Sequence, residues 1–243
     1  MLENHAYGQI IGSPQAPFIN WLARRGALFT ASFAITHPSE PNYLALFSGS
    51  TNGVVGDPCP TSVRGPNLAA DLIAAHLTFA GYSEGLPAPG SNVCAAGEYA
   101  RKHVPWTDFP RLTPSVNLPF SRFPARDFGK LPTVSFVIPN LCHDMHDCSV
   151  ATGDAWLKAH IAGYATWAMT HDSLLIITFD EDDGSQNNQI ATIFLGQRVR
   201  PGRYHARIDH YVVLRTIEQA YGLRLDGRAA RSHPITWIWR GAG

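Results

Sequence analysis

The sequence lacks several features that would point to a particular class of protein. Its 243 residues contain 19 basic and 19 acidic side chains, so the formal net charge is +0. No bulk electrostatic attraction to nucleic acid or to an anionic membrane is therefore expected. Internal repeats, low-complexity tracts, a signal peptide and apolar runs long enough to span a bilayer are all absent from it. What remains is a globular chain that fits one large α/β domain or at most two small ones.

Cysteine is scarce, and no C-x-x-C pair with the usual spacing of a zinc site is present. The four cysteines, Cys59, Cys94, Cys142 and Cys148, lie in Pro- and Gly-rich surroundings. An even number in such surroundings indicates disulfides and an oxidising compartment, so a secreted or periplasmic protein is expected. Of the three possible connectivities we favour Cys59–Cys94 and Cys142–Cys148, the second closing the loop "CHDMHDC". Four buried free thiols are the alternative.

Short apolar runs alternate with helical patterns along the chain. Strands are predicted at Thr133–Ile138, Ser173–Phe179 and Ala191–Gly196, with Leu28–Ala34 as a weaker fourth. Helices are predicted at Phe18–Arg25, Asn67–Ala80, Asp154–Thr170 and His210–Tyr221. This alternation predicts an α/β fold with a mostly parallel central sheet sandwiched by helices.

The region Gly81–Lys130 differs from the rest because it is crowded with Pro, Gly and aromatic residues and has little periodicity. We predict that it is a long loop-rich insertion over the active-site rim of a single domain, residues 1–243. A structureless loop of that length is usually functional.

The stretch "THPSEPNYLALFSGS" predicts a helix that begins at Ser39 and is stopped by Gly49. Serine at this position has two interpretations. It is a favoured N-cap, which is the simpler one. It also lies where free N–H groups and the positive end of the helix dipole attract a phosphate, which suits a nucleophilic hydroxyl.

Polar clusters follow the predicted strands, at the edge where an α/β sheet binds its ligands. "TVSFVI" is followed by "PNLCHDMHDC", "SLLIITF" by "DEDDG", and the weak first strand by "THPSEPN". Ser39, the loop with His143, Asp144 and His146, and the acids Asp180 to Asp183 are therefore expected at one rim.

Within the acidic run, Asp180 and Glu181 are nearest the strand end and are expected to face a cation. Asp182 and Asp183 are expected to turn toward solvent before Gly184. An ordinary solvated turn is the alternative for the whole run.

Further candidates are individually weaker. Glu3 and Asn4 add a carboxylate and an amide, or belong to a frayed terminus. His103, next to Lys102, is either catalytic or structural, and His210 follows Asp209, a plausible N-cap. As a set, the serine, the acids and the histidines indicate metal-assisted transfer onto serine.

Five blocks of sequence together resemble one known family. In chain order they are "ENHAY", "THPSEPNYLALFSGS", "IPNLCHDMHD", "ITFDEDDG" and "DHYVVLRTIEQAYGL". They are similar to the bacterial phosphoesterase family, which contains secreted acid phosphatases and phospholipases C and belongs to the alkaline phosphatase superfamily. The resemblance implies an alkaline-phosphatase-like fold and a metal-dependent phosphoesterase.

The expected activity is that of a phosphomonoesterase of acid phosphatase type, acting on a small phosphate ester through a phosphoserine intermediate. A phosphodiesterase of phospholipase C type is the alternative within enzymes. From another class, an inactive secreted binding protein with an incomplete metal site stays open.

The resemblance also assigns roles to residues. It makes Ser39 the nucleophile. One divalent metal ion, of a kind that the sequence does not name, would be bound by Glu3, Asn4, Ser39, Asp180 and Glu181. The phosphoryl group or the leaving oxygen would be contacted by His103, by His143 or His146, and by His210. One departure is that family members have an apolar strand before "EN", whereas this chain begins "MLEN". A central strand is therefore expected to be missing.

Overall fold

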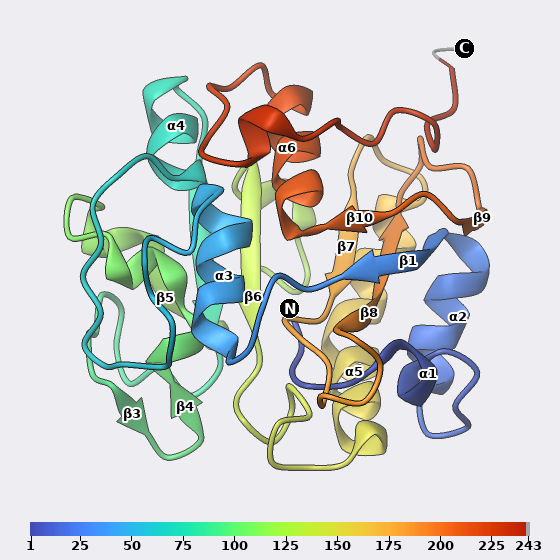
Figure 1. Ribbon diagram of the computed structural model, residues 1–243, viewed down its shortest axis with the longest axis horizontal. Helices are drawn as coiled ribbons and strands as arrows, with labels where there is room; N and C mark the ends of the chain where they lie inside the picture. Colours follow the sequence, from blue (N-terminus) through green and yellow to red (C-terminus); the bar gives the residue numbers. More distant parts are fainter. Residues whose placement is uncertain (242–243) are drawn as a thin grey trace. The chain divides into compact units, whose positions relative to one another are not determined.

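The computed structural model describes residues 1–241, which form two compact units. Unit 1 comprises Met1–Ala34, Cys142–Ile208 and the chain from Ile235 onward, and unit 2 comprises Ile35–Leu141 and Asp209–Pro234. Both combine strands with helices, so the predicted α/β class is confirmed (Figure 1). Among the helices of residues 1–241, none is long and apolar enough to cross a membrane. The prediction of one domain over the whole chain stays a prediction.

Unit 1 is built on a mixed sheet. Its strands are β1 (Ala27–Phe33), β7 (Leu175–Thr178), β8 (Gln189–Leu195) and β9 (Gly202–Tyr204), with the two-residue β10 (Ile208–Asp209) beyond β1. β8 runs antiparallel to both β1 and β7, and β9 runs parallel to β1. The expectation of mostly parallel strands is therefore wrong for this unit. The segment between β7 and β8 is too short for the crossover that parallel neighbours require.

Three helices belong to unit 1: α1 (Tyr7–Ile10), α2 (Pro17–Arg25) and α5 (Val150–Ala168). α2 has no capping side chain of its own, because its N-cap position is Ala16. Asp154 of α5 replaces it, accepting from the backbone N–H groups of Phe18 at 3.0 Å and Ile19 at 2.8 Å. The two predicted helices thus pack together through a buried carboxylate.

Unit 2 contains the parallel strands. β2 (Phe79–Ser83) lies between β5 (Asn117–Pro119) and β6 (Val134–Ile138), and all three are parallel. The predicted helix over Asn67–Ala80 is wrong in its second half, because α4 covers only Leu68–Ala74. The reason is tertiary: β2 is buried along its whole length, and a Cβ at Gly81 would lie 2.0 Å from the Trp106 ring.

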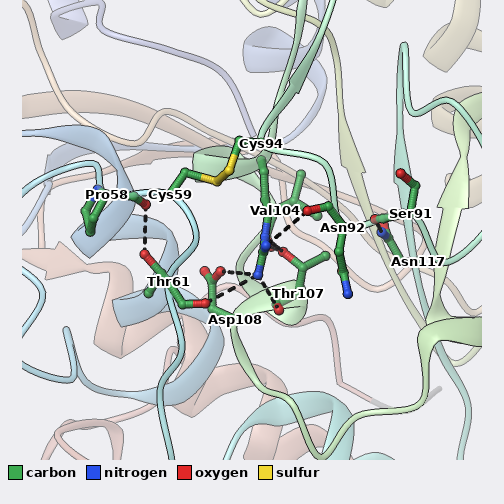
Figure 2. A network of polar contacts seen from close by, with 11 residues as sticks. Pro58, Cys59, Thr61, Ser91, Asn92, Cys94, Val104, Thr107, Asp108 and Asn117 are labelled. Atoms are coloured by element: carbon green, nitrogen blue, oxygen red, sulfur yellow. Dashed lines mark hydrogen bonds and ion pairs between the residues drawn. A yellow bond between two sulfur atoms is a disulfide. The ribbon is translucent and has the colours of Figure 1, made fainter.

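Residues 81–130 are more ordered than the sequence suggested. They include β3 (Ala95–Ala96), β4 (Tyr99–Ala100), β5 and the short 3-10 helices η1 (Arg101–His103), η2 (Pro105–Asp108), η3 (Pro114–Val116), η4 (Phe120–Arg122) and η5 (Phe128–Lys130). Regular structure is sparse in this region, and hydrogen bonds between polar groups connect its loops. The Arg101 guanidinium donates to Thr61 O at 3.3 Å, to Asn92 O at 3.1 Å and to Thr107, and it pairs with Asp108 at 3.5 Å. Figure 2 labels these four partners.

Two disulfides close loops in the two units. Cys59–Cys94 lies in unit 2 beside the Arg101 network (Figure 2), and Cys142–Cys148 lies in unit 1. Both pairs are those predicted. The alternative of four free thiols is wrong.

The helix predicted after "THP" is α3 (Ser39–Ser48), and all ten of its residues are buried. Phe47 anchors it in an aromatic cluster, with ring centroids 5.6 Å from Phe79 and Phe109 and 5.9 Å from Phe136. Gly49 ends α3 with φ of 67°, the left-handed conformation that glycine adopts without strain. The predicted stop is confirmed. α6 (His210–Ala220) packs against α3, and η6 (Ala229–Arg231) follows it.

Candidate active site

Ser39 is the first residue of α3, and the N-cap position belongs to Pro38. The interpretation of Ser39 as a simple N-cap is therefore wrong. The serine is buried, with 1% of its surface exposed. It stands where the first N–H groups of a helix lack intrahelical partners, which favours a bound anion.

Asn42 fixes the chain that leads into Ser39. Its Oδ1 accepts from the N–H groups of Ile35 at 2.9 Å and Thr36 at 3.1 Å, and its Nδ2 donates to Thr36 O at 2.9 Å. A side chain one turn into the helix thus holds the segment before it. Asn42 was not among the predicted site residues, although "PSEPN" contains it.

A second polar link joins the first turn of α3 to η1. Asp57 accepts from the N–H of Glu40 at 2.9 Å through Oδ1 and from Lys102 Nζ at 2.9 Å through Oδ2. The ion pair is only partly exposed, so solvent screens it incompletely. It places a cation beside the N-terminal turn that carries Ser39.

The two predicted histidines of unit 2 come from elements that pack against α3. His103, in η1, stacks on Tyr43 of α3 with ring centroids 5.1 Å apart and planes inclined by 14°. His210 is the first residue of α6, whose N-cap Asp209 accepts from the N–H of Val212 at 2.9 Å, as predicted. Both histidines are buried.

Buried carboxyls lie close to this centre. Burial raises the pKa of Glu40 to about 7, an effect to which the charge of Asp57 adds. Burial, and secondarily the charge of Glu40, raises the pKa of Asp108 to about 8 although Arg101 opposes it. Neither group is predicted by the sequence, because Glu40 lies on a helix buried all round and Asp108 in a short 3-10 helix, and neither leaves a periodic signal.

In unit 1 the start of the chain is held by strand pairing. Leu2 forms a parallel bridge with Phe179: its N–H donates to Thr178 O at 3.0 Å, and its carbonyl accepts from Asp180 N–H at 2.9 Å. Glu3 and Asn4 are thereby placed next to Asp180, whose Oδ1 accepts from Asn4 N–H at 3.1 Å. The interpretation of a frayed terminus is therefore wrong.

Side-chain oxygens gather at that point. One end of the Asn4 amide lies 3.2 Å from Glu3 Oε2 and 3.2 Å from Asp180 Oδ1. With nitrogen at that end the amide donates to both carboxylates, and with oxygen there three oxygens converge. Glu3, Asp180 and Glu181 are all buried. Buried acids need a proton, a donor or a cation as compensation, and oxygen donors are those that hard divalent cations prefer. The residues present fit such a cation.

Asp182 and Asp183 behave differently from each other. The Asp182 carboxylate accepts from the N–H groups of Gly184 at 2.8 Å, Gln186 at 2.7 Å and Asn188 at 3.0 Å, and it is buried. The prediction that Asp182 turns to solvent is wrong, because its carboxylate builds the turn. Asp183 is exposed, as predicted.

The loop between Cys142 and Cys148 brings Asp144, one of the three loop residues expected at the rim, to Glu3. The carbonyl of Asp144 accepts from Glu3 N–H at 2.9 Å, and the Asp144 carboxylate accepts from His146 N–H at 2.8 Å. Asp144 is buried, which raises the pKa of its carboxyl to about 7. From the sequence, Asp144 was a candidate metal ligand or acid–base group together with His143 and His146.

The two histidines of this loop point to other partners. His143 stacks on Trp156 of α5, with ring centroids 6.0 Å apart. His146 is exposed and bonds through Nδ1 to Asp147 Oδ1 at 2.6 Å. Between them Met145 is buried with φ of 83°, a strained value for a residue with a side chain. Gly153 makes room for it, since a Cβ there would lie 2.5 Å from Met145.

The chain is similar to known phosphoesterases. The family model described as the phosphoesterase family matches residues 9–224. A phosphatidylinositol-3-phosphatase of Mycobacterium tuberculosis is 55% identical over 239 residues, covering 98% of this chain and 80% of that protein. An acid phosphatase of Aspergillus fumigatus is 32% identical over 231 residues, covering 86% of this chain and 52% of that protein. The chain thus spans about half the length of that fungal relative.

A solved structure shows the same fold. It is an alkaline phosphatase superfamily protein from Vibrio parahaemolyticus, with a TM-score of 0.62 and 14% identity, covering 96% of this chain and 68% of that one. The predicted alkaline-phosphatase-like fold is confirmed. The chain belongs to the phosphoesterase family, whose members are hydrolases that act on phosphoric ester bonds.

Proposed function

We propose that the protein is a phosphomonoesterase of acid phosphatase type and that Ser39 is its nucleophile. The observation that carries the proposal is the position of Ser39, which is buried at the first residue of α3 without being its N-cap. In the first step Ser39 Oγ bonds to phosphorus, the bond to the leaving oxygen breaks, and that oxygen takes up a proton. Water then hydrolyses the phosphoserine and releases phosphate.

A divalent cation is part of the proposal. Its ligands would be Glu3, Asn4, Asp180 and Glu181 together with the Ser39 oxygen. When bound, it would lower the pKa of the serine hydroxyl and neutralise phosphate oxygens. The buried oxygen donors around Asp180 support this set. In unit 2, the N–H groups at the start of α3 would hold the remaining phosphate oxygens.

Histidines supply the protons in this scheme. His103 and His210 come from elements packed on α3, so they are the proposed donors to the leaving oxygen. His143 or His146 is a further candidate for protonating the leaving oxygen. His146 suits it less well, because it is exposed and bonded to Asp147.

The proposed substrate is a phosphate monoester of a polyol headgroup, since one relative is named a phosphatidylinositol-3-phosphatase. The alternatives are a phosphodiesterase of phospholipase C type and an inactive binding protein. The two disulfides support an oxidising location, secreted or periplasmic.

The test is turnover of an aryl phosphate and of an aryl phosphodiester after metal removal, with divalent metals then added back one at a time. Hydrolysis of the monoester that returns with metal supports the proposal. Preference for the diester would favour the phospholipase C alternative, and hydrolysis of neither ester would favour the binding protein. Chelated protein that keeps full activity would overturn the metal part of the proposal.

A further inference from the structure

Unit 2 contains a cavity of about 290 Å³ that the proposed chemistry leaves unused. One wall is the segment that precedes α3, residues 35–37, and another is the segment that follows it, residues 50–55. Tyr211 of α6 and Arg228 complete the lining. The lining residues are widely separated in the sequence, so no local motif indicated the cavity.

Arg228 gives the cavity a positive charge. Its guanidinium carbon lies 5.7 Å from the centre of the Tyr211 ring, and within residues 1–241 no carboxylate lies at ion-pair distance from it. Its backbone is fixed, because its N–H donates to Gly49 O at 2.7 Å. A Cβ at Gly227 would lie 2.3 Å from the same oxygen, so the turn before Arg228 is packed tightly against the end of α3. These contacts hold the backbone of Arg228, while its exposed side chain leaves the guanidinium open to an anionic oxygen acid.

Hydroxyl groups and apolar side chains line the rest of the cavity. Thr36, Ser50 and Thr51 supply hydroxyls, and Val54 and Val55 form an apolar edge. Val55 is 87% exposed, which is unusual for a large aliphatic side chain beside a polar cavity. The cavity is therefore suited to a ligand that has an anionic group, hydroxyls and an apolar end.

The cavity lies within substrate reach of Ser39. His37, on its wall, is two residues from Ser39, so their Cα atoms are at most about 7 Å apart. The Asn42 bonds to Ile35 and Thr36 hold this wall to the first turn of α3. A group bound in the cavity therefore keeps a fixed relation to the nucleophilic oxygen.

We infer that this cavity binds the second phosphate of the substrate, a phosphodiester that links a phosphorylated polyol to glycerol. Arg228 pairs with the diester, the threonine and serine hydroxyls contact the polyol, and Val54 with Val55 contacts the start of the acyl chains. This inference rests on the proposed function for the position of the scissile monoester at Ser39. The substrate class it names is a phosphorylated glycerophospholipid.

The test is binding, measured by calorimetry on Ser39→Ala protein so that no turnover occurs. Three soluble ligands are compared: dibutanoyl phosphatidylinositol 3-phosphate, its deacylated headgroup, and inositol 3-phosphate, which has no diester. Arg228→Gln should weaken both diester ligands about 10-fold to 100-fold relative to inositol 3-phosphate, the scale expected for a hydrogen-bonded charge. Arg231→Gln, an exposed arginine nearby that does not line the cavity, is the matched control and should keep the preference.

The outcomes separate the two proposals. An unchanged preference in Arg228→Gln, an equal loss in Arg231→Gln, or equal affinity of the parent protein for all three ligands overturns the cavity assignment. A deacylated headgroup that binds as tightly as the lipid removes the role of the valines. If the unsubstituted protein, which has Ser39, hydrolyses no phosphate ester, the proposed function is overturned. The binding comparison would still decide the cavity assignment.

Discussion

The candidate groups of unit 1 are carboxylates at the end of a strand, whereas those of unit 2 are a hydroxyl, imidazoles and a guanidinium on helices and loops. In unit 1, backbone pairing of Leu2 with β7 and its continuation sets Glu3 beside Asp180. In unit 2, burial of all of α3 sets Ser39 in place. Strand pairing therefore positions the residues proposed as cation ligands, and helix packing positions the groups proposed to bind and attack the phosphate.

The units differ again in their buried acids. Unit 2 has a second group of them, Asp71, Glu218 and Asp226, in which Asp226 N–H donates to Glu218 Oε1 at 3.0 Å. Burial raises the pKa of Glu218 to about 7 and of Asp226 to about 8, and the neighbouring acids add to the shifts, while Arg215 and Arg224 oppose them. The raised pKa values mean that the Glu218 and Asp226 carboxyls keep protons in the folded state near neutral pH, whereas Glu3, Asp180 and Glu181 of unit 1 are the candidate cation ligands.

The largest effect is expected from Ser39→Ala. It should lower kcat for an aryl phosphate by about a thousandfold or more, the scale for losing a covalent nucleophile. Stability should change little, since Pro38 and not Ser39 occupies the N-cap. Ser48→Ala is the control in the same helix: it removes the bond from Ser48 Oγ to Leu44 O and should lower stability but keep activity. The reverse pattern would make Ser39 a structural residue only.

The next effect separates acids within unit 1. Asp180→Asn should abolish binding of a divalent metal, because Asp180 lies buried among the oxygens of Glu3 and Asn4. Calorimetry on protein freed of metal by a chelator measures this binding. Asp183→Asn should change the affinity little, since that side chain is exposed. Equal losses in the two variants would show that the acidic run acts only through its total charge.

Removal of Cys59–Cys94 should mainly lower stability, and removal of Cys142–Cys148 should mainly lower activity. Their residues are separated by 35 positions in Cys59–Cys94 and by 6 in Cys142–Cys148, so chain entropy predicts about 4 and about 2 kcal/mol of stabilisation. Paired Cys→Ser variants compared by urea unfolding measure this ranking. The variant without Cys142–Cys148 should lose more of its turnover than of its melting temperature, because that loop holds Asp144 against Glu3. A larger loss of stability from the short loop would contradict the prediction.

The smallest effect concerns pH. A carboxyl whose pKa is raised in the folded state keeps its proton there when the unfolded chain has lost it, so the free energy of unfolding falls as pH rises. If the folded state binds one proton more than the unfolded chain in the Glu218 and Asp226 group, the free energy of unfolding falls by about 2–3 kcal/mol between pH 5.5 and 7.5. Urea unfolding at the two pH values measures it.

Asp226→Asn is the variant that tests the origin of this slope, since it removes one titrating group of the pair. It should make the fall in the free energy of unfolding smaller, by the share of this group, while Glu40, Asp108 and Asp144 keep theirs. Asp183→Asn, in unit 1 and exposed, should leave the pH dependence unchanged. An undiminished slope in Asp226→Asn would place the excess proton elsewhere, for example on Asp108.

The sequence predicted those features that depend on neighbours in the chain. The strands at Val134–Ile138 and Leu175–Thr178, the stop of α3 at Gly49 and the cap at Asp209 all have local signals, such as an apolar run, a glycine or a capping acid. Both disulfides also followed from their loop context. The predicted convergence of the acids with Ser39 at one rim stays a prediction.

Other features depended on tertiary contacts. The sequence predicts the first two residues of β2 as the end of a helix and the rest as loop, because only pairing with β5 and β6 and the Trp106 ring on Gly81 make this segment a strand. Asp182 could not be told from Asp183 by sequence, since only the fold of the turn decides which carboxylate accepts three N–H groups.

By itself, therefore, the sequence determined the α/β class, the family, the helix on which Ser39 lies and the acids after β7. Each of these depends on short segments whose residues are neighbours in the chain. Only the tertiary structure decided which residues surround them: Asp144 beside Glu3, His103 on Tyr43, and Arg228 in the cavity. The physical reason is that contacts between residues far apart in the chain are set by packing and burial, for which the sequence carries no local period.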